Sequence, residues 1–173
     1  MPGTELNASA ASLLGFLHAG EASGYELVKL AEQLIGDFWT LTRSQVYREL
    51  ATLADRGLVR AGPAGPRARQ PYRLTDEGRA AFAEWVTRPP GTEQIRYPLL
   101  LTIAFGSAVE RERLLDFVAE HRALHESRLA GYRERTAAGG LDAYQRATLA
   151  FGLRYEEAVL EWMDELPGIL GET

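Results

Sequence analysis

The fold is decided by residues 42–59, which read TRSQVYRELATLADRGLV. Thr42 stands three residues before Gln45, the spacing of a capping box, and Gly57 is the residue type that ends helices in the left-handed conformation. Between these signals, apolar side chains recur at helical spacing: Val46, Leu50, Leu53 and Ala54. The stretch therefore predicts a helix over 43–56 that buries this face and leaves polar side chains exposed around its first turns: Arg43, Ser44, Gln45, Tyr47 and Arg48.

Further helices and a hairpin are predicted around this stretch. Apolar residues at helical spacing predict two helices before it and one after the hairpin: 8–18, 24–35 and 76–86. The second helix begins at another capping box, Ser23 with Glu26, and Thr75 caps the last. Two short strands are expected at 58–61 and 71–74, joined by a loop rich in Gly, Pro and Arg. This order is that of a winged helix-turn-helix, whose third helix enters the DNA major groove and whose hairpin is the wing.

A second domain is predicted after Pro89-Pro90-Gly91, which breaks the helical pattern and divides the chain into domains 1–90 and 91–173. Three helices are expected there: a short one from Pro98, apolar on every side and so buried, and two longer ones over 110–136 and 142–166. The last helix has leucines on one face and an aromatic row on the other: Tyr144, Phe151, Tyr155 and Trp162. A helix with two apolar faces needs two partners, and we expect the second to be another subunit in a homodimer.

The long helix over 110–136 is expected to bury one apolar stripe that includes Leu114, Leu124 and Leu129. His121 and His125 lie four residues apart on the same stripe, which is also the spacing of metal ligands on a helix. A convincing third ligand is not apparent, so we expect packed histidines at an interface rather than a metal site. A pH-sensitive dimer is the alternative.

Charge is distributed unevenly along the 173-residue chain, whose composition is otherwise that of an ordinary globular protein. The net charge is −5, yet residues 40–80 hold eight arginines and four acidic residues. Cysteine is absent, which excludes disulfides and thiolate chemistry. A signal peptide and a membrane-spanning apolar stretch are not found, so we expect a cytoplasmic protein without membrane contact. Motifs of nucleotide-binding loops, hydrolases and zinc proteases do not occur, and neither an enzyme nor a bound cofactor is expected.

The basic segment has the chemistry of a protein that binds double-stranded DNA. Arginine bonds guanine or phosphate, glutamine pairs with adenine, and hydroxyl groups donate to phosphate oxygens. We therefore expect seven side chains at the DNA: Arg43, Ser44, Gln45, Tyr47 and Arg48 on the helix, and Arg67 and Arg69 in the wing. Two copies in a homodimer would read a pseudo-palindromic operator. The acidic net charge favours an alternative, a winged-helix module that binds a protein partner and has no small-molecule effector.

Six short motifs lie between residues 12 and 86: Leu13-Leu14-Gly15-Phe16-Leu17, Ser23-Gly24-Tyr25-Glu26-Leu27, Phe38-Trp39, Val46-Tyr47-Arg48-Glu49-Leu50, Leu53-Ala54-Asp55-Arg56-Gly57-Leu58-Val59 and Tyr72-Arg73-Leu74-Thr75-Asp76-Glu77-Gly78. As a set they resemble the PadR family of bacterial transcriptional regulators. The resemblance implies a dimeric repressor with a helical C-terminal dimerisation region, often released from DNA by a small and frequently aromatic effector. It also implies DNA contacts by the start of the third helix, including Tyr47, and a wing that contains Arg67 and Arg69.

An aromatic effector would stack on flat side chains, and four are candidates for its pocket: Trp39, Trp85, Tyr97 and Phe105. Residues of this type also fill cores and interfaces, so packing is the competing explanation for each. Taken together, the patterns predict a mainly α-helical protein with a small β-hairpin wing. Its N-terminal part would be a winged helix-turn-helix, and its C-terminal part a helical dimerisation and effector-binding region.

Overall fold

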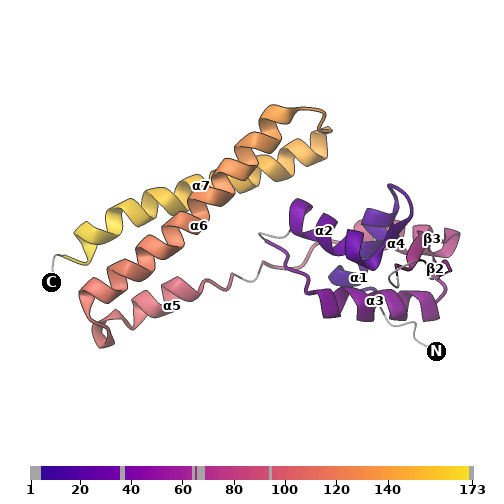
Figure 1. The fold of residues 1–173 in the computed structure, drawn as a ribbon, viewed down its shortest axis with the longest axis horizontal. Helices are drawn as coiled ribbons and strands as arrows, with labels where there is room; N and C mark the ends of the chain where they lie inside the picture. The colour runs from indigo at the N-terminus through magenta and orange to yellow at the C-terminus, as the bar shows by residue number, and fades with distance from the viewer. Residues whose placement is uncertain (1–4, 36–37, 64, 66–68, 94, 172–173) are drawn as a thin grey trace. The chain divides into compact units, whose positions relative to one another are not determined.

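The computed structural model describes residues 5–35, 38–63, 65, 69–93 and 95–171. The chain divides into two compact units, Met1–Thr92 and Glu93–Thr173, which are drawn in Figure 1. Helices dominate both units, and a small antiparallel sheet lies in the first, so the predicted fold class is confirmed. In the described part of the chain, no helix could span a bilayer.

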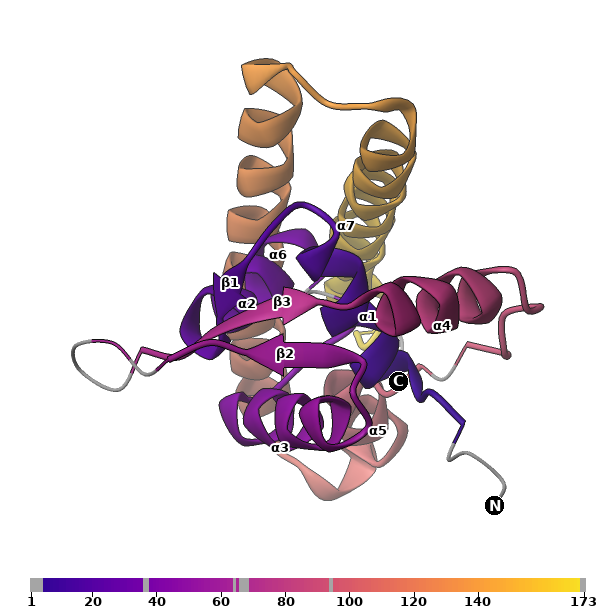
Figure 2. The same ribbon diagram turned by 90° about the vertical axis from the view of Figure 1, so that its right-hand side faces the viewer.

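The first unit has, within its described residues, four helices and a three-stranded sheet. In chain order these are α1 (Ala8–Leu17), β1 (Ala22–Ser23), α2 (Gly24–Leu34), α3 (Arg43–Asp55), β2 (Val59–Ala61), β3 (Pro71–Leu74) and α4 (Asp76–Val86). Figure 2 shows β3 between β1 and β2, in the order β1-β3-β2. The predicted helices and hairpin strands agree with these bounds within one residue at each end. The two-residue strand β1 is an addition, because two residues are too few to show a periodic pattern.

Local polar contacts fix where the helices begin and end. Capping boxes are present at the start of α2 and of α3, and the Gln45 Oε1 accepts from the Thr42 backbone N–H at 2.9 Å. Thr75 caps α4 by accepting from the Gly78 N–H at 3.0 Å. Gly57, directly after the C-cap of α3, has φ of 70°, the left-handed conformation that ends this helix. Each of these signals spans four residues or fewer, which is why the sequence predicts them.

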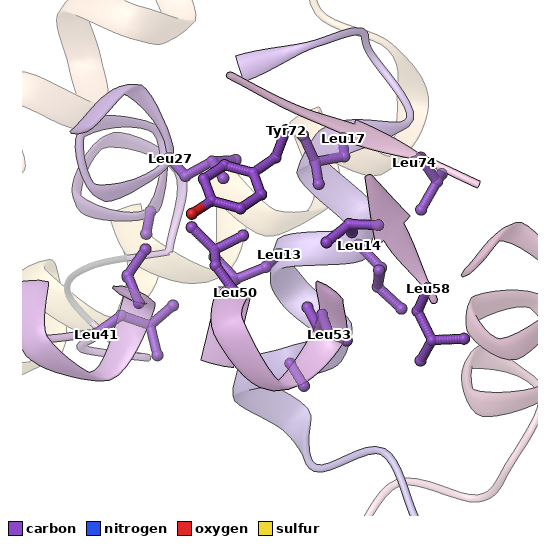
Figure 3. Packing of buried hydrophobic residues seen from close by; sticks show 14 of the residues in the cluster. Leu13, Leu14, Leu17, Leu27, Leu41, Leu50, Leu53, Leu58, Tyr72 and Leu74 are labelled. Carbon is purple, nitrogen blue, oxygen red and sulfur yellow. The ribbon is translucent and has the colours of Figure 1, made fainter. Parts of the chain in front are cut away.

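The core of the first unit is built mainly from leucines of α1, α2, α3 and the hairpin, and Figure 3 shows their side chains converging. Its labelled members are Leu13, Leu14, Leu17, Leu27, Leu41, Leu50, Leu53, Leu58, Tyr72 and Leu74. Burying a leucine contributes about 1.5–3 kcal/mol, so the face of α3 that carries Leu50 and Leu53 is fixed toward this core. The opposite face of α3 must therefore point outward.

The second unit consists of α5 (Pro98–Ala104), the short 3₁₀ helix η2 (Gly106–Ala108), α6 (Arg111–Ala138) and α7 (Ala143–Ile169). Figure 1 shows α6 and α7 side by side as an antiparallel pair. Gly139 and Gly140, with φ of 71° and 74°, turn the chain between them. The face of α7 against α6 carries a buried set at helical spacing: Leu149, Gly152, Glu156, Met163 and Leu166.

Two predictions about the second unit are wrong. The helix α5 is not buried on every side: it packs through Leu99, whereas Leu101 and Phe105 are 65% and 67% exposed. In α6, Leu124 is exposed, although His125 of the same predicted stripe is buried as expected. Both errors have one cause, because a single packing partner covers one stripe of a helix, and apolar composition alone does not say which residues that stripe contains.

Candidate nucleic-acid interface

The start of α3 presents an exposed basic surface. Arg43, Ser44, Tyr47 and Arg48 are all exposed, while Val46 on the opposite face is buried in the core. Within the described residues, neither arginine forms an ion pair with an acidic side chain. Their guanidinium groups keep the N–H donors that bond guanine bidentately or bind phosphate. We call these four residues the α3 surface.

Gln45 differs from this group because its side chain already has a local role. Its Oε1 accepts from both the backbone N–H and the hydroxyl of Thr42, each at 2.9 Å. A glutamine that pairs with adenine uses its oxygen and its nitrogen together. In this conformation the oxygen is occupied, so Gln45 serves the helix cap, and adenine contact requires the cap to open.

Tyr47 is held in place by the helix before α3. Its ring lies against the first residue of α2, where a Cβ on Gly24 would come within 2.7 Å of the Tyr47 Cε1 atom. The Arg43 guanidinium lies 5.7 Å from the centroid of the same ring, a cation–π contact. Gly24 thus permits the two helices of the helix-turn-helix to approach, and the Tyr47 side chain is 41% exposed at the surface that results.

Of the two arginines predicted in the wing, the structure describes Arg69, and its guanidinium pairs with an acidic side chain of the same unit. The Arg69 guanidinium donates to Glu26 of α2, and the following strand repeats the pattern, since Arg73 pairs with Glu21 at 3.1 Å. Arg67, which the sequence also predicts as a DNA contact, lies outside the described residues. Arg69 and Arg73 therefore have acidic partners in the first unit, unlike the arginines of the α3 surface.

Arg60 is a further exposed cation that the sequence-based prediction omits. It lies on β2 directly opposite Arg73 of β3, and both side chains point to the solvent side of the hairpin. Their neighbours Val59 and Tyr72 are buried, so the strands alternate between core and solvent. This alternation is visible in the sequence and would have placed both arginines on one face.

Two family models match the chain, one for each unit. Residues 13–84 match the model of the transcriptional regulator PadR-like family, and residues 95–170 match the model named virulence activator alpha C-term. Residues 13–84 therefore belong to the PadR-like family of transcriptional regulators. The resemblance carried by the six motifs is thereby confirmed.

The relatives of this PadR-like chain cover between 69% and 96% of it. A probable transcriptional regulator of Mycobacterium tuberculosis is 29% identical over 87% of this chain and 91% of its own. The negative transcriptional regulator PadR of Bacillus subtilis is 29% identical over 69% of this chain and 68% of its own. Its structure with operator DNA has a TM-score of 0.77 at 23% identity and covers 96% of this chain and 99% of that one, and it has also been solved with p-coumaric acid. The Vibrio cholerae virulence activator AphA has a TM-score of 0.72 at 28% identity and covers 95% of this chain and 98% of that one.

The four aromatic residues considered for an effector pocket have different surroundings in this PadR-like protein. Trp39, after α2, is 43% exposed. Trp85 is partly buried on α4, where its ring stacks on Phe82 with centroids 6.4 Å apart. In the second unit, Tyr97 is partly buried, and Phe105 is largely exposed. Packing therefore accounts for the positions of Trp85 and Tyr97.

A buried polar triad in the second unit joins residues that the sequence did not connect. His125 of α6 and Glu156 of α7 are both almost fully buried and hydrogen-bonded through Nδ1 and Oε2. The Tyr97 hydroxyl lies 3.0 Å from the other ring nitrogen. In the neutral imidazole, Nδ1–H donates to Glu156 and Nε2 accepts from Tyr97, so both nitrogens are satisfied. Burial, together with the nearby Tyr155 and Glu156, raises the pKa of Tyr97 to about 12.

The predicted aromatic row on α7 separates into an exposed part and an inward part. Tyr144, Phe151 and Tyr155 are 85%, 59% and 37% exposed. The rings of Phe151 and Tyr155 stack with centroids 6.2 Å apart. Trp162, by contrast, packs within the unit beside Tyr97, with ring centroids 6.0 Å apart. Three of the four residues thus leave apolar surface uncovered in the single chain.

Proposed function

We propose that two copies of this PadR-like regulator form a homodimeric repressor that binds a pseudo-palindromic operator in double-stranded DNA and is released by a small aromatic effector. The observation that carries the DNA-binding part is the α3 surface. Its two arginines lack acidic partners within the described residues, and the helix that bears them is fixed by a buried opposite face. A helix oriented in this way can place side chains against base edges without a loss of core packing.

The residues take different roles in this proposal. Arg43 reads bases, Arg48 reads bases or binds phosphate, and Ser44 and Tyr47 donate to phosphate oxygens. Gln45 caps α3, and it can contact DNA only when this cap opens. Residues 1–90 supply DNA binding, while residues 91–173 supply the dimer contact and the effector site.

Exposed apolar surface on the second unit supports the homodimer. Four side chains are each more than half exposed in the single chain: Leu101 on α5, Phe105 directly after it, and Tyr144 and Phe151 on α7. Large apolar side chains in this number are costly to leave in water and are typical of a surface that a second subunit covers. A two-fold dimer also gives a reason for a pseudo-palindromic operator.

The repressor and effector parts of the proposal draw on the relatives. The Bacillus subtilis relative is named a negative regulator, and its structure has been solved both with operator DNA and with p-coumaric acid. An effector releases DNA when it binds one arrangement of the two winged units more tightly than the other. The aromatic candidates Tyr97 and Phe105 of the second unit are the first positions to vary in a search for its site, followed by Trp39 and Trp85 of the first unit.

Fluorescence anisotropy tests the proposal. The duplex is one that the protein selects from a random pool, compared with a scrambled duplex at several salt concentrations. We expect two protomers per selected duplex and affinity that falls steeply with salt. Arg43→Ala should weaken operator binding by about 1–3 kcal/mol and scrambled binding by less, because base readout is lost. Arg154→Ala on α7 removes the same charge from the second unit and should leave both affinities unchanged.

Two results would count against the proposal. An equal loss on both duplexes with Arg43→Ala would show that this residue contributes charge rather than base readout. A folded dimer that binds no duplex from the pool would favour the protein-interaction module instead. Addition of p-coumaric acid to the same assay tests whether an aromatic acid releases the DNA.

A further inference from the structure

The Glu26 carboxylate of α2 has two separate partners. Its Oε2 accepts from the backbone N–H of Ser23 at 2.8 Å and from the Ser23 hydroxyl at 2.7 Å, which completes the cap of α2. Its Oε1 accepts from the Arg69 guanidinium of the wing. The Ser23 hydrogen bonds first, and the Arg69 charge second, hold the pKa of Glu26 below its usual value of 4.5. The group is therefore ionised at neutral pH.

This contact lies where the wing joins the helix-turn-helix. Next to it, β1 pairs with β3, with Ser23 opposite Pro71. An open hollow of about 330 Å³ lies beside the pair and is lined by residues of both parts, among them Glu21, Glu26, Gly65 and Arg69. Both side chains of the pair are substantially exposed, at 65% for Arg69 and 41% for Glu26. A phosphate group from solution can therefore reach the Arg69 guanidinium.

We propose that Glu26 competes with DNA phosphate for the Arg69 guanidinium. It binds Arg69 in the free protein and so lowers the affinity of the wing for DNA. The proposal rests on the proposed function, since it assumes that the wing meets a duplex. Carboxylate and phosphate bind the same guanidinium donors by charge-assisted hydrogen bonds, so a donor given to one is lost to the other. After exchange, the ionised Glu26 stays fixed by its cap bonds close to the arriving phosphate and repels it.

The substitution Glu26→Gln tests this competition without removal of the helix cap. The structure shows that glutamine can fill the capping position, because Gln45 does so in α3 with the same hydrogen bonds to Thr42. An exposed ion pair contributes little, so we expect E26Q to bind DNA about two- to fivefold more tightly. The gain should be similar for the selected and the scrambled duplex, because phosphate contacts carry no sequence information. The log–log salt slope should steepen by up to about 0.9.

Two further variants distinguish competition for Arg69 from a general effect of removing one negative charge. Glu32→Gln removes the same charge from an exposed position of the same helix. We expect E32Q to change the affinity less than E26Q does. In an Arg69→Gln background, E26Q should change the affinity no more than E32Q does, since the competing pair is already absent. Thermal unfolding of each variant checks that the cap and the fold are retained.

The outcomes distinguish this inference from the proposed function. If the unaltered protein binds neither duplex, the proposed function fails. If it binds DNA but E26Q binds no more tightly, or E32Q matches the gain of E26Q, the competition is wrong and the Glu26–Arg69 pair serves the structure of the wing. A gain in the Arg69→Gln background that exceeds the gain of E32Q would also overturn the proposal, because it could not come from release of Arg69.

Discussion

At the scale of single residues, Gly78 shows how closely the wing and α4 are packed. A Cβ at this position would lie 2.0 Å from the backbone oxygen of Leu58 and 2.8 Å from the Leu74 Cδ1 atom. Both neighbours belong to the base of the hairpin, and the Gly78 N–H is the donor that Thr75 caps. A glycine is needed here because any side chain would separate α4 from the strands.

Substitution by alanine at Gly78 and at Gly131 should therefore have opposite effects on the free energy of unfolding. Gly78→Ala inserts a methyl group against backbone that cannot move freely, and we expect a loss of about 3 kcal/mol in the free energy of unfolding. Gly131→Ala in α6 meets no atom within 4 Å. It should stabilise by about 0.5–1 kcal/mol, because alanine loses less backbone entropy than glycine in a helix. Urea unfolding measures both, and similar midpoints for the two variants would contradict the packing described at Gly78.

At the scale of elements, α7 separates two kinds of surface on one helix. Leu149 and Glu156 face α6 and are buried, while Phe151 and Tyr144 point outward and are exposed. A charge on the outward face should leave the α6–α7 pair intact in the protomer and act only on a contact with another subunit. The helix therefore allows folding and assembly to be tested separately.

Phe151→Glu is expected to convert the dimer to a monomer without unfolding of the second unit. A carboxylate in place of a buried aromatic ring at the subunit contact would lack a partner, and its desolvation opposes association. Light scattering reports the mass and circular dichroism the helix content. Ala150→Glu is the matched control: it adds the same charge one residue away, about 100° round the helix, where we expect the dimer to persist. A dimeric Phe151→Glu variant would place the subunit contact elsewhere.

The elements also show what the sequence can and cannot predict. Helix ends were predictable because a cap such as Thr42 with Gln45 acts over four residues. The partner of His125 was not, because Glu156 lies 31 residues away and the α6–α7 packing brings them together. Likewise, the acidic partner of Arg69 comes from α2, 43 residues earlier. Chemistry that depends on residue type, such as an exposed arginine on α3, could be predicted, whereas tertiary pairing could not.

At the scale of the whole molecule, the local distribution of charge matters more than the net charge. The net charge is −5, and the arginines of residues 40–80 give a locally basic segment. Two of them, Arg69 and Arg73, are matched by acids from the preceding segment. This leaves five without acidic partners within the described residues: Arg43, Arg48, Arg56, Arg60 and Arg79. Because salt screens charges beyond about 8–10 Å, the DNA would respond to these nearby arginines more than to the net charge.

The half-site spacing of the operator is a prediction about the dimer as a whole. For the proposed two-fold dimer, we expect two copies of α3 to enter successive major grooves on one side of the duplex, about 34 Å or one helical turn apart, or a small adjustment from that.

Insertion of about five base pairs between the half-sites rotates one half-site to the opposite side of the duplex. A dimer that is bound to the other half-site cannot reach the rotated one. We expect such a duplex to bind with the affinity of a single half-site. Anisotropy titrations of the parent, the half-turn insertion and a duplex with one half-site scrambled compare these directly. If the half-turn insertion bound as tightly as the parent, each protomer would read DNA independently. The symmetric arrangement proposed for this PadR-like regulator would then be wrong.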